Sequence, residues 1–212
     1  MLLLLALELA GAAPRDWARV VERRAQGHGA ALERAGALLA ALLRHAVALP
    51  ATRLVLIPGI GADPVRAAGS GALRVVTVAD SAQLLAAIAR AQPGDAIEVQ
   101  AGVYRIAQTG IEVTRPGRAN APIVVRARRL GEVRIELDAL EGFHVQAPHW
   151  NFENLEIHGV CEPDDRCEHA FHVVGAGRDF VLRNSVLRDF NAHLKINGDA
   201  GAFPDGGRVT LN

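Results

Sequence analysis

The feature that most constrains the fold is a short hydrophobic triplet that recurs in the second half of the chain. Phe143-His144-Val145 is followed 28 residues later by Phe171-His172-Val173, and 23 residues after that by Leu194-Lys195-Ile196. Each triplet alternates apolar, polar and apolar side chains, which is the period of a β-strand with one buried face. A unit this short cannot bury its apolar face alone, so successive units have to stack on one another.

Short β runs of the same kind fill the chain from residue 73 onward, separated by the turn-forming residues Gly, Asn, Asp and Pro. We expect strands at residues 73–78, 96–99, 111–113, 123–125, 133–135, 143–145, 152–157, 171–173, 180–187, 194–196 and 209–211. A β-sandwich would need hairpin turns between longer strands, and the one Asn-Gly pair, Asn197-Gly198, falls where stacked units would turn. The sequence therefore predicts an all-β solenoid over residues 73–212: a right-handed, single-stranded parallel β-helix.

Residues 14–72 have a different character. Their first part is rich in Ala, Leu and Arg, with apolar side chains at helical spacing and interruptions at Gly27, Gly29 and Gly36. This pattern predicts one or two helices, followed by a Gly- and Pro-rich linker. A further amphipathic helix is expected after the first strand, with Ser81 as its N-cap.

Residues 1–13 are similar to a secretory signal peptide, because an apolar run is followed by the small residues Gly11-Ala12-Ala13. No positive charge precedes the run and Glu8 lies inside it, so an ordinary N-terminal helix is the alternative. The run is too short to cross a bilayer, and we expect no membrane span. The signal-like pattern predicts a secreted or periplasmic protein.

Cys161 and Cys167 are the only cysteines, and they flank a turn-rich segment. In an exported protein they would pair as a disulfide that closes this loop. Two alternatives stay open: a zinc site with His169 and His172, which follow at once, or two free thiols in a cytoplasmic chain.

The charge balance argues against nucleic acid as the main partner, because phosphate binding needs a basic surface. The chain has 23 Lys and Arg against 23 Asp and Glu, with a formal net charge of zero. Lys195 is the single lysine among those basic residues.

The first part of the predicted β-region resembles a known family. Residues 75–104, with Ser81-Ala-Gln-Leu-Leu-Ala-Ala-Ile88, Pro93-Gly94-Asp95 and Ala101-Gly-Val-Tyr104, are similar to the opening of pectin-lyase-like parallel β-helices. Ala121-Pro-Ile-Val-Val-Arg-Ala127 and Gly131-Glu-Val-Arg-Ile135 continue as in the chondroitinase B and alginate lyase group, the polysaccharide lyase family 6-like proteins. The resemblance implies that the Ser81 helix caps the first turn of the coil.

Strand alternation predicts the candidate site. If Phe171 and Val173 point inward, His172 points outward, and the same parity places His144 and Lys195 outside. Equivalent positions on neighbouring turns stack about 4.8 Å apart, so these three side chains should form one column, flanked by His193. Such a cationic column suits an acidic polysaccharide, and we predict that His144, His172 and His193 bind the substrate.

A lyase acting on a uronate needs a base for the proton next to the carboxylate and a cation that neutralises the carboxylate. We predict Lys195 as the base and Arg208 as the stabilising cation; the alternative is that Lys195 is a solvated surface residue. Calcium-dependent lyases of the group carry a Glu-x-Glu pair shortly before the lysine, whereas here Asp189 is the only nearby acid. We therefore assign no metal ligand, while Ca²⁺ stays open as a cofactor.

Three further expectations complete the prediction. Asn184 and Asn212 each close a β run, with Asn154 near the equivalent place, and these asparagines should stack as structural turn residues. Trp150 and Tyr104 are either sugar platforms or core residues. The predicted coil has no second cap, so we expect the chain to be the N-terminal part of a longer protein.

The predicted function is an exported protein that binds or cleaves an acidic polysaccharide; the alternative is a non-catalytic surface scaffold.

Overall fold

The computed structural model describes residues 14–45, 74–107, 110–163 and 166–212, and the chain divides into two compact units, residues 1–58 and 59–212. In the first unit, α2 (Pro14–Ala25) and α3 (Ala30–His45) pack against each other around the buried side chains of Ala18 and Ala40. Gly36 lies so close to Ala25 that a Cβ atom there would clash with the alanine side chain. The predicted helical segment therefore consists of two helices.

The second unit contains three sheets, and every pairing between its named strands is parallel. The six-stranded sheet runs in the order β1 (Arg74–Val78), β2 (Asp95–Val99), β5 (Ile123–Ala127), β8 (Trp150–Glu153), β11 (Val181–Arg183) and β14 (Arg208–Thr210). A four-stranded sheet contains β3 (Gly102–Ile106), β6 (Val133–Leu137), β9 (Glu156–Gly159) and β12 (Val186–Arg188). The other four-stranded sheet contains β4 (Ile111–Val113), β7 (Glu141–Val145), β10 (His169–Val174) and β13 (Ala192–Asn197).

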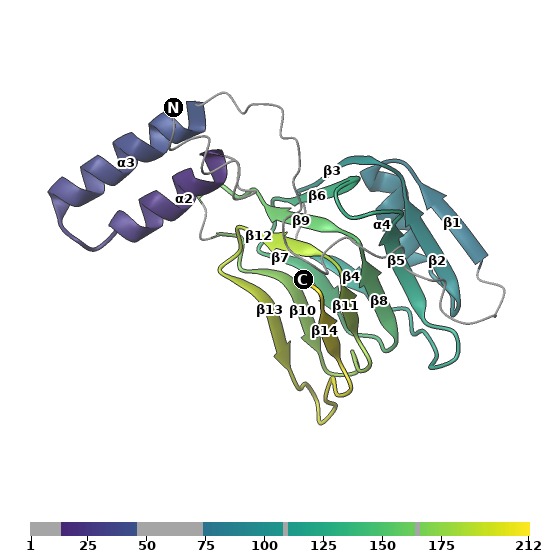
Figure 1. Ribbon diagram of the computed structural model, residues 1–212. Coiled ribbons are helices and arrows are strands. Elements are labelled where there is room, and N and C mark those ends of the chain that lie inside the picture. Colours follow the sequence, from purple (N-terminus) through teal and green to yellow (C-terminus); the bar gives the residue numbers. More distant parts are fainter. Residues whose placement is uncertain (1–13, 46–73, 108–109, 164–165) are drawn as a thin grey trace. The chain divides into compact units, whose positions relative to one another are not determined.

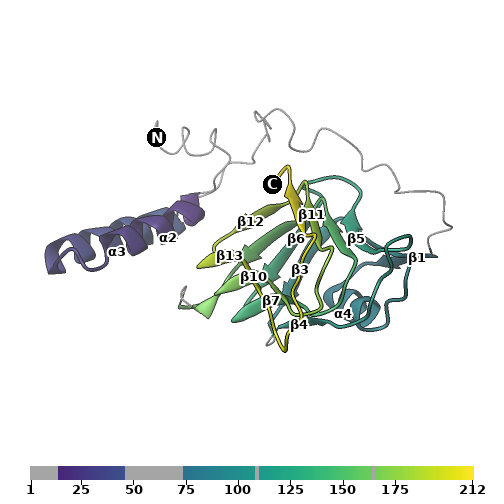
Figure 2. The same cartoon turned by 90° about the horizontal axis from the view of Figure 1, so that it is seen from below.

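The chain visits these three sheets in rotation, from β2 to β3 to β4, then from β5 to β6 to β7, and so on. Figures 1 and 2 show the strands of each sheet side by side, with successive turns of the chain following one another along the sheets. The core lies between the sheets, where aligned positions repeat the same kind of side chain. Phe143 and Phe171, for example, are register partners with stacked rings 5.0 Å apart.

Helix α4 (Ser81–Ala89) lies over the first strands of this unit, in contact with β1, β2, β3 and β4. Its Leu84 and Ile88 side chains are buried in the core. The prediction of Ser81 as N-cap was wrong by one residue. Asp80 is the cap, because its backbone is extended and its carboxylate accepts a hydrogen bond from the Gln83 N–H at 2.8 Å.

Two predicted strands are each divided in the structure. Residues 152–157 fall into β8 and β9, and residues 180–187 into β11 and β12, while β3 was not among the expected strands. The breaks occur at Asn154 and Asn184, whose φ angles of 60° and 48° are left-handed and incompatible with a continuous strand. Asparagine tolerates this conformation better than other non-glycine residues, which explains its place at these corners.

The expected asparagine stack is present at these corners. Asn154 Nδ2 donates to the Ala127 carbonyl at 2.9 Å, and Asn184 Nδ2 donates to Asn154 Oδ1 at 2.7 Å. Asn212 Nδ2 donates to the Leu182 carbonyl, and Asn212 Oδ1 accepts from the Ser185 N–H. The side chains thus satisfy backbone groups that the corner removes from the sheets.

The structure also decides between the alternatives left open for the two cysteines and the two large aromatic residues. Cys161 and Cys167 form a disulfide, so neither is a zinc ligand or a free thiol. Trp150 and Tyr104 are fully buried, which makes them core residues and excludes them as sugar platforms. The signal-like residues 1–13 and the linker lie outside the described residues. Within the described part of the chain, no helix is long and apolar enough to cross a bilayer.

Candidate functional site

A column of polar side chains runs across the outer face of the β4–β7–β10–β13 sheet. The register pairs Glu112 with His144, His144 with His172, and His172 with Lys195. The two imidazole rings are stacked with their centroids 5.0 Å apart. The column predicted from strand alternation is therefore present, and it extends one strand further than expected, to Glu112. We call these four residues the polar column.

The first half of the polar column is held by an acid and an amide. His144 Nδ1 lies 3.3 Å from Glu112 Oε1 and 3.3 Å from Gln146 Nε2. Gln146 Nε2 in turn donates to Glu112 Oε2 at 2.6 Å. Gln146 has the same strand parity as His144, so both side chains reach the same face. These contacts fix the orientation of the His144 ring.

The second half is centred on His172, which is buried and has a polar partner at each ring nitrogen. Its Nδ1 lies 3.0 Å from Glu141 Oε1, and its Nε2 lies 2.7 Å from Asn197 Oδ1. Burial raises the pKa of Glu141, but the hydrogen bond to His172 and the positive charges of His172, His144 and Lys195 lower it further. The net result is a pKa of Glu141 below its ordinary value, so this carboxylate stays ionised at neutral pH.

Lys195 and His193 lie on β13 and are both exposed. Within the described ranges, the Lys195 ammonium has no hydrogen-bond or ion-pair partner, so it is available to a ligand on this face. The His193 ring lies edge-on to the ring of Phe190, with 6.4 Å between the centroids. Partial desolvation lowers the pKa of His193 and favours its neutral form.

Arg208 is not brought to the polar column. It begins β14 in the six-stranded sheet, where its register partner is Val181, whereas Lys195 belongs to the β4–β7–β10–β13 sheet. The alternation of β14 places Val209 in line with the buried Leu182 and therefore turns Arg208 outward on a different sheet. The role predicted for Arg208 stays a prediction.

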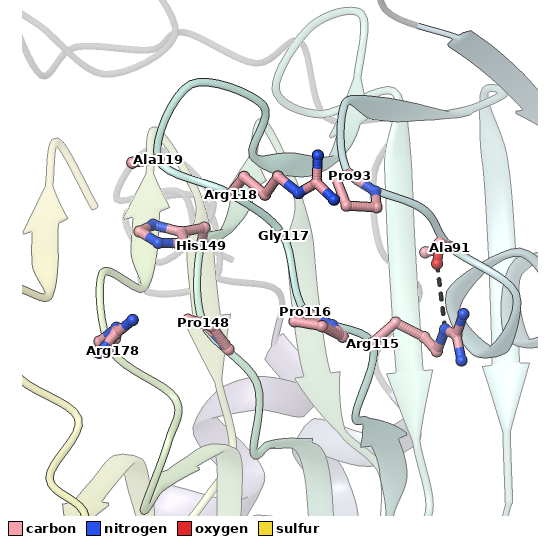
Figure 3. A pocket seen from close by; sticks show the side chains of 10 residues that line it. All are labelled: Ala91, Pro93, Arg115, Pro116, Gly117, Arg118, Ala119, Pro148, His149 and Arg178. Atoms are coloured by element: carbon pink, nitrogen blue, oxygen red, sulfur yellow. Dashed lines mark hydrogen bonds between the residues drawn. The ribbon is translucent and has the colours of Figure 1, made fainter.

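A basic hollow of about 510 Å³ lies beside the turns that follow β4, β7 and β10. Its charged or titratable lining side chains are all basic: Arg115, Arg118, His149 and Arg178. Figure 3 shows Arg118 extending toward Pro93, with His149 and Arg178 on the other side. Arg115 Nε donates to the Ala91 carbonyl at 3.4 Å. The hollow offers positive charge at the edge of the sheet that carries the polar column.

Sequence reasoning missed four residues of this site. Glu112 lies between the buried Ile111 and Val113, and Gln146 and Asn197 share the parity of His144 and Lys195, so alternation alone was a sufficient signal for these three residues. Alternation could not have identified Glu141 as an outward residue, because Glu141 has the same parity as the inward Phe143. It begins β7, where its side chain turns out toward His172.

The fold and site thus define a protein of parallel sheets with a polar column and a basic hollow on its surface. Residues 78–155 match the family model described as Chondroitinase B. These residues include Glu112, Glu141 and His144 and stop before His172 and Lys195. The chain therefore resembles chondroitinase B over its first turns.

Among solved structures, an alginate lyase from Paenibacillus sp. str. FPU-7 is similar to this chain. The sequence identity is 21%, the TM-score is 0.39, and the match covers 53% of this chain and 44% of the alginate lyase. The match thus spans less than half the length of that enzyme. No curated protein matches the chain.

Proposed function

We propose that the second unit is a right-handed parallel β-helix that binds an acidic polysaccharide along the polar column. The rotation of the chain through three parallel sheets supports the helix, as does the asparagine stack at its corners. The chondroitinase B match supports the ligand class, because chondroitin is an acidic polysaccharide.

The observation that carries the proposal is the register of His144, His172 and Lys195 on neighbouring strands. A column of polar side chains repeating at the spacing of the strands, with the exposed Lys195 ammonium at its end, suits a chain whose carboxylates also repeat. The basic hollow adds positive charge beside the same sheet. Export of the protein is part of this proposal and is supported by the disulfide between Cys161 and Cys167.

We further propose that Lys195 cleaves a 4-linked uronate by β-elimination. Its Nζ acts as the unprotonated amine and becomes an ammonium as it removes the proton on C5; the C–H electron pair forms the C4–C5 double bond, and the C4–O glycosidic bond breaks. The departing oxygen takes up a proton. The support for this role is that the Lys195 side chain is exposed beside His172 and has no partner among the described residues, because a base must reach the reacting proton directly.

The test measures the ultraviolet absorbance of unsaturated uronate products with alginate, pectate, chondroitin and dermatan, each with and without Ca²⁺. We expect absorbance to rise with one of these substrates and Lys195→Ala to abolish the rise. Lys195→Arg separates charge from proton transfer, because arginine stays protonated. Full activity of Lys195→Arg would contradict the role of Lys195 as base, and Arg208→Ala in the same assay tests the predicted stabilising cation.

The second candidate function is a non-catalytic binding scaffold. It is favoured by the residues just before Lys195, where no carboxylate pair stands at the place expected from calcium-dependent lyases. Retardation of the folded protein in gels that contain each polysaccharide tests binding directly. Retardation without any uronate product would support the scaffold, whereas neither signal with all four substrates would contradict both functions.

A further inference from the structure

Glu141, His144 and His172 place three metal-ligating atoms within 4.8 Å of one another. Glu141 and His144 come from β7, and His172 comes from the neighbouring strand β10. Parallel pairing thus brings together residues that are 31 and 28 positions apart in sequence. Because all three stand on one rigid sheet, their separation is set by the fold and not by a loop.

The hydrogen bonds around His172 orient its ring so that Nδ1 faces Glu141 within this cluster. Asn197 Nδ2 donates to the Gly198 carbonyl at 3.1 Å, so Asn197 turns its Oδ1 toward His172 Nε2 at 2.7 Å. That oxygen is an acceptor, and Nε2 therefore carries the proton. His172 Nδ1 faces a carboxylate oxygen, Glu141 Oε1, at 3.0 Å. Either a proton on Nδ1 or a cation bound by both atoms satisfies this contact, and the metal titration below distinguishes the two.

The donor set selects the kind of cation. Imidazole nitrogens suit Zn²⁺ and other late transition metals, whereas Ca²⁺ and Mg²⁺ prefer oxygen ligands. A histidine that binds a metal through one nitrogen commonly donates its other N–H to an oxygen, which is the arrangement of His172 and Asn197. Glu112 and Gln146 hold His144 in a comparable way.

We propose that Glu141, His144 and His172 form a three-ligand site for a divalent transition metal, for which Zn²⁺ is the probe. In a tetrahedral zinc site with bonds of about 2.0–2.2 Å, neighbouring ligand atoms lie about 3.3 Å apart. The 3.0 Å separation of Glu141 and His172 is close to this value, and the His144 ligand atom lies within 4.8 Å of the other two. The side chains of Glu141 and His144 are 25% and 24% exposed, so solvent or a ligand can reach the fourth position.

The site also adds to the proposed function. Lys195 is the register partner of His172, so a metal held by His172 lies on the strand next to the proposed base. There it would supply the positive charge that neutralises a uronate carboxylate, in place of the carboxylate pair that the sequence lacks. This role rests on the proposed function, whereas metal binding itself does not.

The experiment titrates the 212-residue chain, stripped with a chelator, with Zn²⁺ by calorimetry at neutral pH, and with Co²⁺ by visible absorption. We expect one equivalent of each metal to bind. Glu141→Gln, His144→Ala and His172→Ala should each remove this binding, and Asn197→Ala should weaken it about 10- to 100-fold. His28→Ala is the matched control, because His28 lies in the first unit and should leave binding unchanged. Circular dichroism of each variant verifies its fold.

Absence of Zn²⁺ heat and Co²⁺ absorption would overturn the proposal and would mean that a proton lies between Glu141 and His172. Binding that survives all three ligand substitutions would overturn it as well. Lys195→Ala keeps the two proposals apart, because it should bind Zn²⁺ like the unmodified chain while forming no uronate product. Zn²⁺ binding without uronate product would support the metal site and contradict the lyase function. Uronate product without Zn²⁺ binding would support the lyase function and contradict the metal site.

Discussion

Asn184 donates a 2.7 Å hydrogen bond through Nδ2 to Oδ1 of Asn154, one turn of the chain earlier. Both side chains are buried and both residues have left-handed backbone. The pair therefore performs two tasks at the same corner: it satisfies buried polar atoms, and it supplies a conformation that most residues resist.

Substitution of Asn184 separates these two tasks. Asn184→Gly removes the side-chain hydrogen bond but accepts the φ of 48°, and we expect it to lower the free energy of unfolding by about 1–3 kcal/mol. Asn184→Ala removes the hydrogen bond and adds left-handed strain, so it should cost a further 1–2 kcal/mol or so. Denaturant unfolding measures both variants, and equal stability of the two would show that the backbone strain is not significant.

Gly142 lets β7 and β10 approach each other beneath His144 and His172. A Cβ atom at this position would clash with the backbone carbonyl of Ala170 and with the Leu137 side chain. We expect Gly142→Ala to destabilise the fold by about 1–3 kcal/mol, because overpacking displaces the strands. Gly207→Ala is the control: its Cβ would meet only an ordinary contact at 3.7 Å, and stability should change by less than about 0.5 kcal/mol. An equal loss in both variants would contradict the clash.

Glu153 should make the protein less stable as the pH rises. Its carboxyl is buried, with Oε2 lacking a hydrogen-bond partner among the described residues. Desolvation raises its pKa, although the charges of Arg183 and Arg126 oppose this. A raised pKa in the folded state costs nothing below the ordinary value of 4.5, and the cost grows as the pH rises through the folded pKa. Glu153→Gln should therefore unfold at higher denaturant than the unmodified chain at neutral pH, with the difference vanishing in acid.

Glu141 should show the opposite dependence. Its pKa is lowered below the ordinary value of 4.5, so its contribution to stability is complete above 4.5 and is lost as the pH falls through the lowered value. Glu141→Gln removes the ionised group, so the variant should be less stable at neutral pH and converge with the unmodified chain in strong acid. Denaturant unfolding across this pH range measures the difference. A difference that grows toward low pH would contradict the contact with His172.

The disulfide should stabilise the loop that leads from β9 into β10. Cys161 and Cys167 are both buried, and they close a loop with a sequence separation of 6. Replacement of both by serine should lower the free energy of unfolding by about 2 kcal/mol, because the unfolded chain gains freedom. Mass spectrometry after alkylation of the unreduced protein verifies the bond, and modification of both thiols in that sample would show that it is absent.

Local alternation of apolar and polar residues was enough to predict most strands of the second unit. Alternating triplets identified the outward positions of His144, His172 and Lys195, and the structure places them in one register. The corners were predicted only in part, because Asn154 and Asn184 were expected as turn residues while residues 152–157 and 180–187 were each expected as a single strand. Their left-handed backbone is required only where the chain passes from one sheet to the next, and this condition is not encoded in the alternation.

The site was predictable only in part for a similar reason. Arg208 follows Lys195 closely in sequence but lies on another sheet, because each turn of the chain passes through three sheets. Glu141 has the parity of a core residue, yet it contacts His172 from the start of its strand. Neither fact follows from spacing along the chain.

The sequence by itself determined the stacking of short strands and the side chains that alternation turns outward, because the two-residue period of a strand is a local property. It also offered a disulfide between its only two cysteines as one of three alternatives, and the structure decided among them. The tertiary structure alone decided which polar groups meet across strands: Glu141 with His172, His172 with Asn197, and Asn154 with Asn184. These contacts depend on the register and on the corners between sheets, where the backbone departs from the regular period and redirects the side chains.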